Sequence, residues 1–132
     1  MIDAIWVPTS VHFVTGTFVA VATLAALVAA LLTAVRSRPL ARWAQTLFIL
    51  AQVSLAVQAL IGIKLLDQGL GPLQLYIHYL GGLGPLFFYL LYYWLPASFR
   101  ERRWSATLVT GAAFLFAIMA YGIGQTYVAT AA

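Results

Sequence analysis

Four long apolar runs constrain the fold of this chain more than any other feature. They cover residues 10–35, 43–66, 73–95 and 105–128, and hardly any charged residue lies inside them. A helix needs about 20 apolar residues to cross the hydrocarbon core of a bilayer. Lipid offers the backbone no hydrogen-bond partners, so runs of this kind should be helices. We therefore expect an all-α membrane protein, a four-transmembrane-helix bundle that forms one domain over residues 1–132.

Composition agrees with lipid as the surrounding medium. Hydrophobic residues make up 64% of the chain and charged residues only 8%, with a mean hydropathy of +0.96. A soluble domain carries about 25% charged residues, so too few are present here to cover a water-facing surface. Cysteine is absent, which excludes disulfides and thiolate metal sites. The N-terminus lacks a basic segment before its long apolar run, so we expect no cleaved signal peptide.

Basic residues predict the orientation of the bundle. Short connections at 36–42, 67–72 and 96–103 make neighbouring helices antiparallel. The first connection holds Arg36, Arg38 and Arg42, and the third holds Arg100, Arg102 and Arg103. Because cytoplasmic loops are rich in such residues, these two connections should face the cytoplasm, with both termini outside. The net charge of +4 thus indicates topology rather than nucleic-acid binding, and we expect an integral protein of a prokaryotic cytoplasmic membrane.

The two histidines of the chain, His12 and His78, both lie inside predicted spans. Ionisable residues within a membrane are costly and tend to be functional. Each histidine lies a few residues into a helix that starts outside, roughly 6–9 Å below its beginning. The two helices run parallel, so both imidazoles should share one depth and can face each other across the core.

Two imidazoles on facing helices can hold a haem iron from both sides. A flat porphyrin also needs small residues beside its ligands. Gly16 follows His12 by four residues, and Gly81 and Gly82 follow His78 by three and four, which places them on the histidine faces. A zinc site needs three or four protein ligands and fits less well. We predict that His12 and His78 ligate a haem iron and that Gly16 and Gly82 adjoin the porphyrin ring.

The remaining polar residues of the spans leave alternatives open. Lys64, the only lysine, closes the second run and could pair with a haem propionate, or else with Asp67. Gln52 and Gln58 lie six residues apart on that run, so they face different directions, and each is expected to bond across helices. The histidines could likewise bond only to neighbouring groups.

Three segments carry a wider resemblance. They are His12-Phe-Val-Thr-Gly-Thr-Phe, Ala51-Gln-Val-Ser-Leu-Ala-Val-Gln-Ala-Leu-Ile-Gly and Tyr76-Ile-His-Tyr-Leu-Gly, and the two histidines are 66 residues apart. Over about two thirds of the chain this pattern resembles one half of the haem A synthase family, whose members look like a duplicated four-helix bundle with a histidine pair in each half. The resemblance implies that His12 and His78 ligate a b-type haem near the outer face.

The chain departs from that family at two catalytic positions. The family carries a glutamate three residues before the first histidine and often an arginine after it, where this chain has Thr9 and Phe13. These 132 residues also hold one half-bundle rather than two. The resemblance therefore implies a cytochrome b-like relative that holds haem or transfers electrons, rather than a synthase.

Two other functions are compatible with the sequence. The chain could be an accessory or structural subunit of a respiratory or photosynthetic membrane complex, in which a histidine might ligate chlorophyll singly. It could also be a small transporter or channel, although few polar groups line any path. No hydrolase, kinase or nucleotide-binding motif is present. The expected partners are the bilayer, other membrane subunits or a second copy of the chain, and no nucleic acid.

Overall fold

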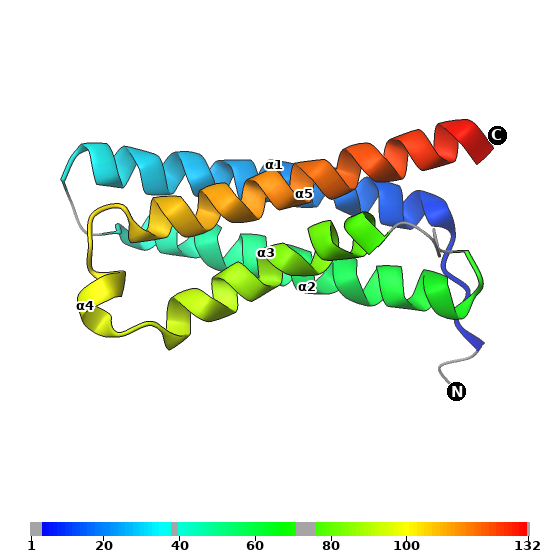
Figure 1. Ribbon diagram of the computed structural model, residues 1–132, viewed down its shortest axis with the longest axis horizontal. Helices are drawn as coiled ribbons and strands as arrows, with labels where there is room; N and C mark the ends of the chain where they lie inside the picture. Colours follow the sequence, from blue (N-terminus) through cyan, green and yellow to red (C-terminus); the bar gives the residue numbers. More distant parts are fainter. Residues whose placement is uncertain (1–3, 38–39, 71–75, 132) are drawn as a thin grey trace.

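Four long helices and one single-turn helix make up the part of the chain that the structure describes. The computed structural model describes residues 4–37, 40–70 and 76–131. The helices are α1 (Thr9–Val35), α2 (Arg42–Asp67), α3 (Tyr76–Trp94), α4 (Ala97–Arg100) and α5 (Ser105–Ala131). The four long helices lie side by side along the length of the molecule (Figure 1). Helix α1 begins and α5 ends at one end of this bundle, and α4 lies at the other (Figure 1).

The helices coincide closely with the apolar runs. Helices α1, α2 and α5 agree with the predicted ranges to within a few residues at each end. The predicted run 73–95 corresponds to α3, and its residues 73–75 lie outside the described part of the chain. The third connection contains the one-turn helix α4, which is too short to leave a hydropathy signal.

Three of the described helices are long and apolar enough to cross a membrane. They are α1, α2 and the part of α5 from Ser105 to Thr126. Helix α3 does not belong to this group, because its 19 residues include five tyrosines, three glycines and Pro85, which lower its mean hydropathy. The fold is therefore all-helical in its described residues and consistent with a helical membrane protein.

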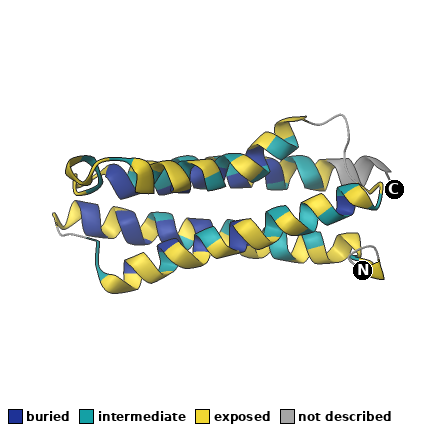
Figure 2. Ribbon diagram, turned by 90° about the horizontal axis from the view of Figure 1, so that it is seen from below, coloured by how far each residue is buried: buried dark blue, intermediate teal, exposed yellow. Residues whose placement is uncertain are grey.

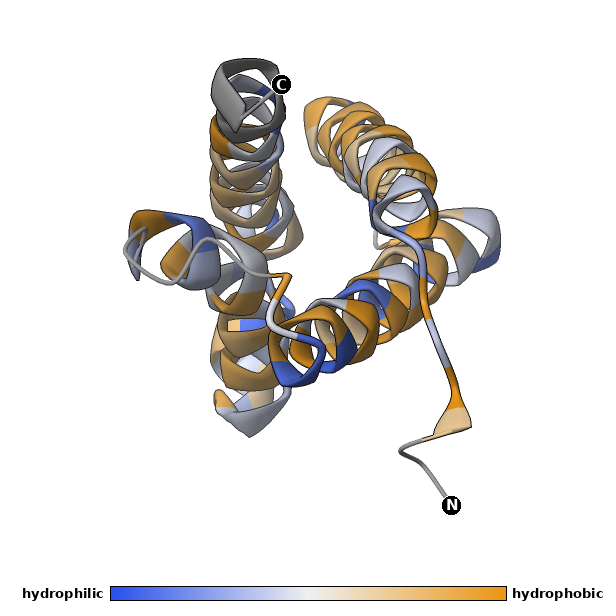
Figure 3. Cartoon of the chain, turned by 90° about the vertical axis from the view of Figure 1, so that its right-hand side faces the viewer, coloured by the Kyte–Doolittle hydropathy of each residue, from blue (hydrophilic) through white to orange (hydrophobic). Residues whose placement is uncertain are grey.

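Large apolar side chains cover the outside of the bundle. Val14 is 65% exposed, Leu60 66% and Leu115 64%, and similar side chains recur on every long helix. Buried residues concentrate between the helices while exposed residues face outward (Figure 2). Viewed from the end, the outward faces are mainly hydrophobic (Figure 3). A contiguous apolar surface of this extent is suited to lipid rather than water.

The order of the helices around the bundle places α1 and α3 at opposite corners. Helix α1 packs against α2 and α5, while α3 packs extensively against α5 and less so against α2. The end-on view shows the long helices arranged around a common centre (Figure 3). Any two side chains that point inward from α1 and α3 therefore approach each other across the centre.

Small residues form most of the core. Ala26 and Ala30 of α1, Ala51 of α2, and Ala113 and Ala117 of α5 are all buried. Small side chains let the backbones of membrane helices approach closely, and that contact replaces the hydrophobic driving force that lipid cannot supply. The core is thus densest where α1 and α5 meet their neighbours.

Aromatic side chains fill the looser junction of α2 and α3. The Phe48 ring is buried and lies 4.6 Å from the Tyr89 ring and 5.1 Å from the Tyr92 ring, measured between centroids. The Gln52 amide nitrogen donates to the Tyr93 hydroxyl at 3.1 Å. Gln52 therefore bonds across helices, as the sequence predicts.

The closest approach of α3 and α5 occurs at Gly81. A Cβ atom added to Gly81 would lie 2.7 Å from the Ala120 Cβ and 3.0 Å from the Phe116 carbonyl oxygen. No Cβ contact of 2.7 Å is tolerated without movement of one helix. At the adjacent Gly82 an added Cβ would meet nothing within 4 Å.

Gly81→Ala should lower the free energy of unfolding by about 1–3 kcal/mol, since the new methyl group separates α3 from α5. Gly82→Ala is the matched control. It adds the same methyl group in open space, where a glycine-to-alanine change inside a helix is favourable by up to about 1 kcal/mol. Thermal unfolding of both variants in one detergent measures the difference. Equal melting temperatures would contradict the close contact.

Candidate functional site

His12 and His78 meet in the interior near one end of the bundle. His12 lies in the first turns of α1 and His78 in the first turns of α3. Their ring centroids are 6.1 Å apart, with an angle of 62° between the ring planes. Both side chains are half-buried. The structure thus places the two imidazoles beside each other in the bundle, and their common depth in a membrane stays a prediction.

The His78 ring is held by the backbone of α5. Its Nδ1 atom lies 3.0 Å from the Ala120 carbonyl oxygen. A carbonyl oxygen only accepts hydrogen bonds, so Nδ1 carries the proton and Nε2 of the neutral ring keeps a free lone pair. Histidines that bind metals commonly fix their tautomer by such a bond to a carbonyl oxygen. His78 therefore has the protonation pattern of a ligand through Nε2.

The His12 ring is held by a side chain of α2. The Gln58 amide nitrogen lies 3.0 Å from the His12 carbonyl oxygen, 3.1 Å from Nδ1 and 3.3 Å from Nε2. The Thr15 hydroxyl donates to the Gln58 carbonyl oxygen, which fixes the orientation of the amide. Because an amide nitrogen only donates, the ring nitrogen that it reaches must be unprotonated. Gln58 thus bonds across helices, as predicted, and its partner is the candidate ligand itself.

Two glycines that sequence reasoning missed make room for the rings. A Cβ atom on Gly62 of α2 would lie 3.3 Å from the His12 Cε1 atom. A Cβ atom on Gly124 of α5 would lie 3.3 Å from the His78 Cε1 atom. Each glycine belongs to the next long helix after the histidine's own, so no fixed spacing in the sequence reveals it. In an antiparallel hairpin the end of the second helix lies beside the start of the first. A glycine near the end of the second helix could therefore have been predicted to lie level with the histidine.

The predicted haem-facing glycines have different surroundings. A Cβ atom on Gly16 would lie 3.2 Å from the Gln58 amide nitrogen and 3.5 Å from the Tyr121 ring. Gly16 therefore packs against α2 and α5. Gly82, by contrast, borders open space. Of the two, Gly82 is the position beside which a flat ring would find room without movement of a side chain.

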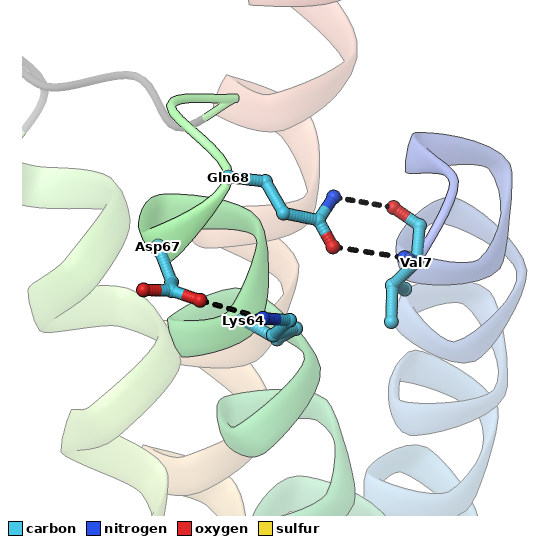
Figure 4. Close-up of polar contacts among 4 residues, drawn as sticks. All are labelled: Val7, Lys64, Asp67 and Gln68. Atoms are coloured by element: carbon cyan, nitrogen blue, oxygen red, sulfur yellow. Dashed lines mark hydrogen bonds and ion pairs between the residues drawn. The ribbon is translucent and has the colours of Figure 1, made fainter. Parts of the chain in front are cut away.

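Lys64 is paired in this structure. Its Nζ atom lies 2.6 Å from the Asp67 Oδ2 atom, and only 15% of the Lys64 side chain is exposed, against 59% for Asp67 (Figure 4). The sequence analysis left two partners open for Lys64, a haem propionate and Asp67, and the structure shows the pair with Asp67. A role for Lys64 toward a propionate stays a prediction.

A backbone clamp fixes the entry of α1 beside this site. The Val7 backbone nitrogen donates to the Gln68 side-chain oxygen at 2.8 Å, and the Gln68 amide nitrogen donates to the Val7 carbonyl at 2.9 Å (Figure 4). Val7 precedes His12 by five residues, whereas Gln68 directly follows α2. The clamp therefore sets the depth of His12 relative to α2.

The centroid distance between the two rings is comparable to that of two imidazoles on one metal ion, although both His12 ring nitrogens contact Gln58 here. An imidazole nitrogen ligates a metal at about 2.0–2.1 Å, so two such rings on opposite sides of one ion have centroids roughly 6 Å apart. The observed 6.1 Å agrees with this value. No group of three or more His, Cys, Asp or Glu side chains gathers among residues 4–37, 40–70 and 76–126. The candidate centre thus consists of two histidines, with Gln58 the side chain that must turn away from His12.

Comparison with known proteins adds no functional assignment. No protein-family model, curated protein or solved structure matches the chain. Because one fold can serve many functions, function has to be inferred from the side chains that converge at this site.

In the ligand-free protein, His78 should be the Nδ1–H tautomer, since Ala120 offers only an acceptor. ¹⁵N NMR of the histidine-labelled protein in micelles distinguishes the two tautomers. Gln58→Leu should shift the His12 ring nitrogens and leave His78 unchanged, whereas the matched Gln52→Leu should leave both unchanged. A His78 ring protonated at Nε2 would rule out this arrangement.

Proposed function

We propose that the protein holds one b-type haem between His12 and His78 in the membrane and serves in electron transfer or haem holding. The observation that carries this proposal is the pair of imidazoles 6.1 Å apart on diagonal helices. The bond from His78 to Ala120, which leaves Nε2 of His78 free, supports it. The resemblance to half of a haem A synthase favours the same function.

We further propose that all four long helices cross the bilayer, with both termini outside. Helix α2 ends near the start of α1, whereas α5 begins at the opposite end beside α4 (Figure 1). If α2 and α5 both cross, α3 must traverse the membrane to join them. Its 19 residues extend about 28 Å, close to the hydrocarbon thickness of about 30 Å. Basic residues of the two connections at the α4 end favour a cytoplasmic position for that end.

Each residue of the site has a distinct part in this proposal. His12 and His78 would each hold the haem through a ring nitrogen, and the Ala120 carbonyl oxygen orients His78. Gln58 bonds to His12 in the ligand-free protein, and Gly82 leaves open space beside α3. A bound haem would supply one-electron chemistry.

The acidic residues favour electron transfer over an oxidation of substrate. The chain contains three of them, Asp3, Asp67 and Glu101, and none belongs to the interior of a span. Asp67 lies at the end of α2 and is paired with Lys64, while Glu101 is exposed beside α4. Thr9 occupies the position of the family's glutamate. Of the carboxylates that the structure describes, Asp67 and Glu101, neither is buried beside the two histidines.

The purified protein, supplied with haem, should show the Soret band and low-spin spectrum of two histidine ligands. His12→Ala and His78→Ala should each abolish the low-spin spectrum and weaken haem binding at least about tenfold, because each removes an iron ligand. Absorption spectroscopy in the oxidised and reduced states measures both effects. A pigment lost only with one of the two histidines would instead favour singly ligated chlorophyll.

A glycine pair provides the matched control for this experiment. Gly82→Leu should block haem uptake by filling the space beside His78, with little change in the stability of the ligand-free protein. Gly122→Leu adds the same side chain at an exposed position of α5 that also borders open space, and should bind haem normally. Haem binding that is equal in both variants would place the ring elsewhere.

The orientation is testable because the chain contains no cysteine. A membrane-impermeant maleimide applied to intact cells should label Leu70→Cys, in the second connection, and fail to label Ser98→Cys, in α4. Both variants should react fully once detergent opens the membrane, which controls for accessibility. The reverse pattern would invert the proposed topology.

A further inference from the structure

A cavity opens at the end of the bundle opposite the histidines. It has a volume of about 540 Å³ and lies between α2, the end of α3 and the segment that joins α3 to α5. Its walls include Leu40, Phe48, Ile49, Tyr92, Arg100 and Arg102. This volume is within the range of about 300–1,000 Å³ that small-molecule sites occupy. The proposed haem site makes no use of this cavity.

One wall of the cavity is apolar and continues onto the outer surface. Phe48 is buried at its base, whereas Ile49 is 53% exposed on the face that α2 presents outward. The neighbouring Leu50 and Val53 of α2 are also exposed. In a membrane this face contacts acyl chains, so the cavity opens toward lipid.

The other wall carries three arginines, Arg100, Arg102 and Arg103, and one carboxylate, Glu101, so it has a net positive charge. One guanidinium nitrogen in this wall has no hydrogen-bond partner among the described residues. Arg103 donates to the Ala34 and Val35 carbonyl oxygens at the end of α1, and Arg102 stacks over the Phe99 ring at 5.6 Å. The Nε atom of Arg100 is buried and has no hydrogen-bond partner among the described residues. Arginine stays charged and a buried donor requires an acceptor, so the Arg100 Nε atom needs one that residues 4–37, 40–70 and 76–126 do not provide.

We propose that this cavity binds an acidic phospholipid, with the phosphate on Arg100 and an acyl chain along Phe48 and Ile49. Arginine suits phosphate because its planar fork matches the phosphate oxygens. Basic pockets at the ends of membrane helices bind anionic head groups, and acidic lipids gather where basic connections meet the bilayer. The apolar wall that leads to the lipid face favours a lipid phosphate over a free one. The inference rests on membrane placement and is independent of haem.

Lipid retention by the full chain tests the proposal. The protein is embedded in nanodiscs of equal parts phosphatidylglycerol and phosphatidylcholine, then released for native mass spectrometry. The wild type should retain phosphatidylglycerol, and Arg100→Gln should weaken that retention about tenfold, as expected for the loss of one charge-assisted contact. Arg36→Gln removes the same charge at an exposed position of the first connection outside the cavity, and should change retention less than about twofold.

Three results would overturn the proposal. They are equal retention of the two lipids, an equal loss in Arg36→Gln, and displacement of phosphatidylglycerol by millimolar inorganic phosphate, which would assign the site to free phosphate. Photoactivatable analogues of both lipids keep the test decisive if Arg100→Gln fails to fold. With the wild type, the acidic analogue should label peptides 40–49 and 92–106 preferentially, and equal labelling would refute the site.

Discussion

The close approach of α3 and α5 is the contact on which the candidate site depends. Gly81 brings the two backbones so near that an added methyl group would overlap Ala120. The same approach lets the His78 ring reach the Ala120 carbonyl oxygen, and Gly124 leaves space for the ring beside it. A larger residue at Gly81 would therefore act on His78 as well as on stability. Packing and ligand orientation are set here by one helix contact.

The two helical hairpins of the bundle satisfy the hydrogen bonds of their histidines in different ways. In each helical hairpin, α1 with α2 and α3 with α5, a histidine near the start of the first helix packs against a glycine of the second, Gly62 or Gly124. An unsatisfied ring nitrogen in lipid costs several kcal/mol, so each ring needs a partner. A backbone carbonyl serves His78, whereas the Gln58 side chain serves His12. Only the second partner can turn away without movement of a helix.

Hydropathy alone predicts most of the fold. The predicted runs 10–35, 43–66 and 105–128 agree with α1, α2 and α5 to within a few residues, since crossing lipid imposes length and composition directly. The prediction that His12 and His78 lie at equal depth followed from helix rise and from the short connections. The partners of the two histidines on other helices could not be predicted from the sequence, because packing decides which helix faces meet. The sequence predicted that Gln58 would bond across helices, but it did not identify His12 as the partner. The one-turn helix α4 was not predicted, because it is too short to show a periodic pattern.

The bond between Gln58 and His12 helps explain how a half-buried histidine pair is stable in a ligand-free membrane protein. Without a metal, each ring already has a hydrogen-bond partner on a neighbouring helix. An iron held by both rings, as proposed, would take the place of the bond from Gln58 to His12 and would leave the bond from His78 to Ala120 unchanged. The Gln58 amide keeps Thr15 and the His12 carbonyl as partners, so its turn away from the ring is small. A fixed backbone group thus holds the histidine of α3 and a movable side chain holds the histidine of α1, which favours the proposed role of the pair as a haem site.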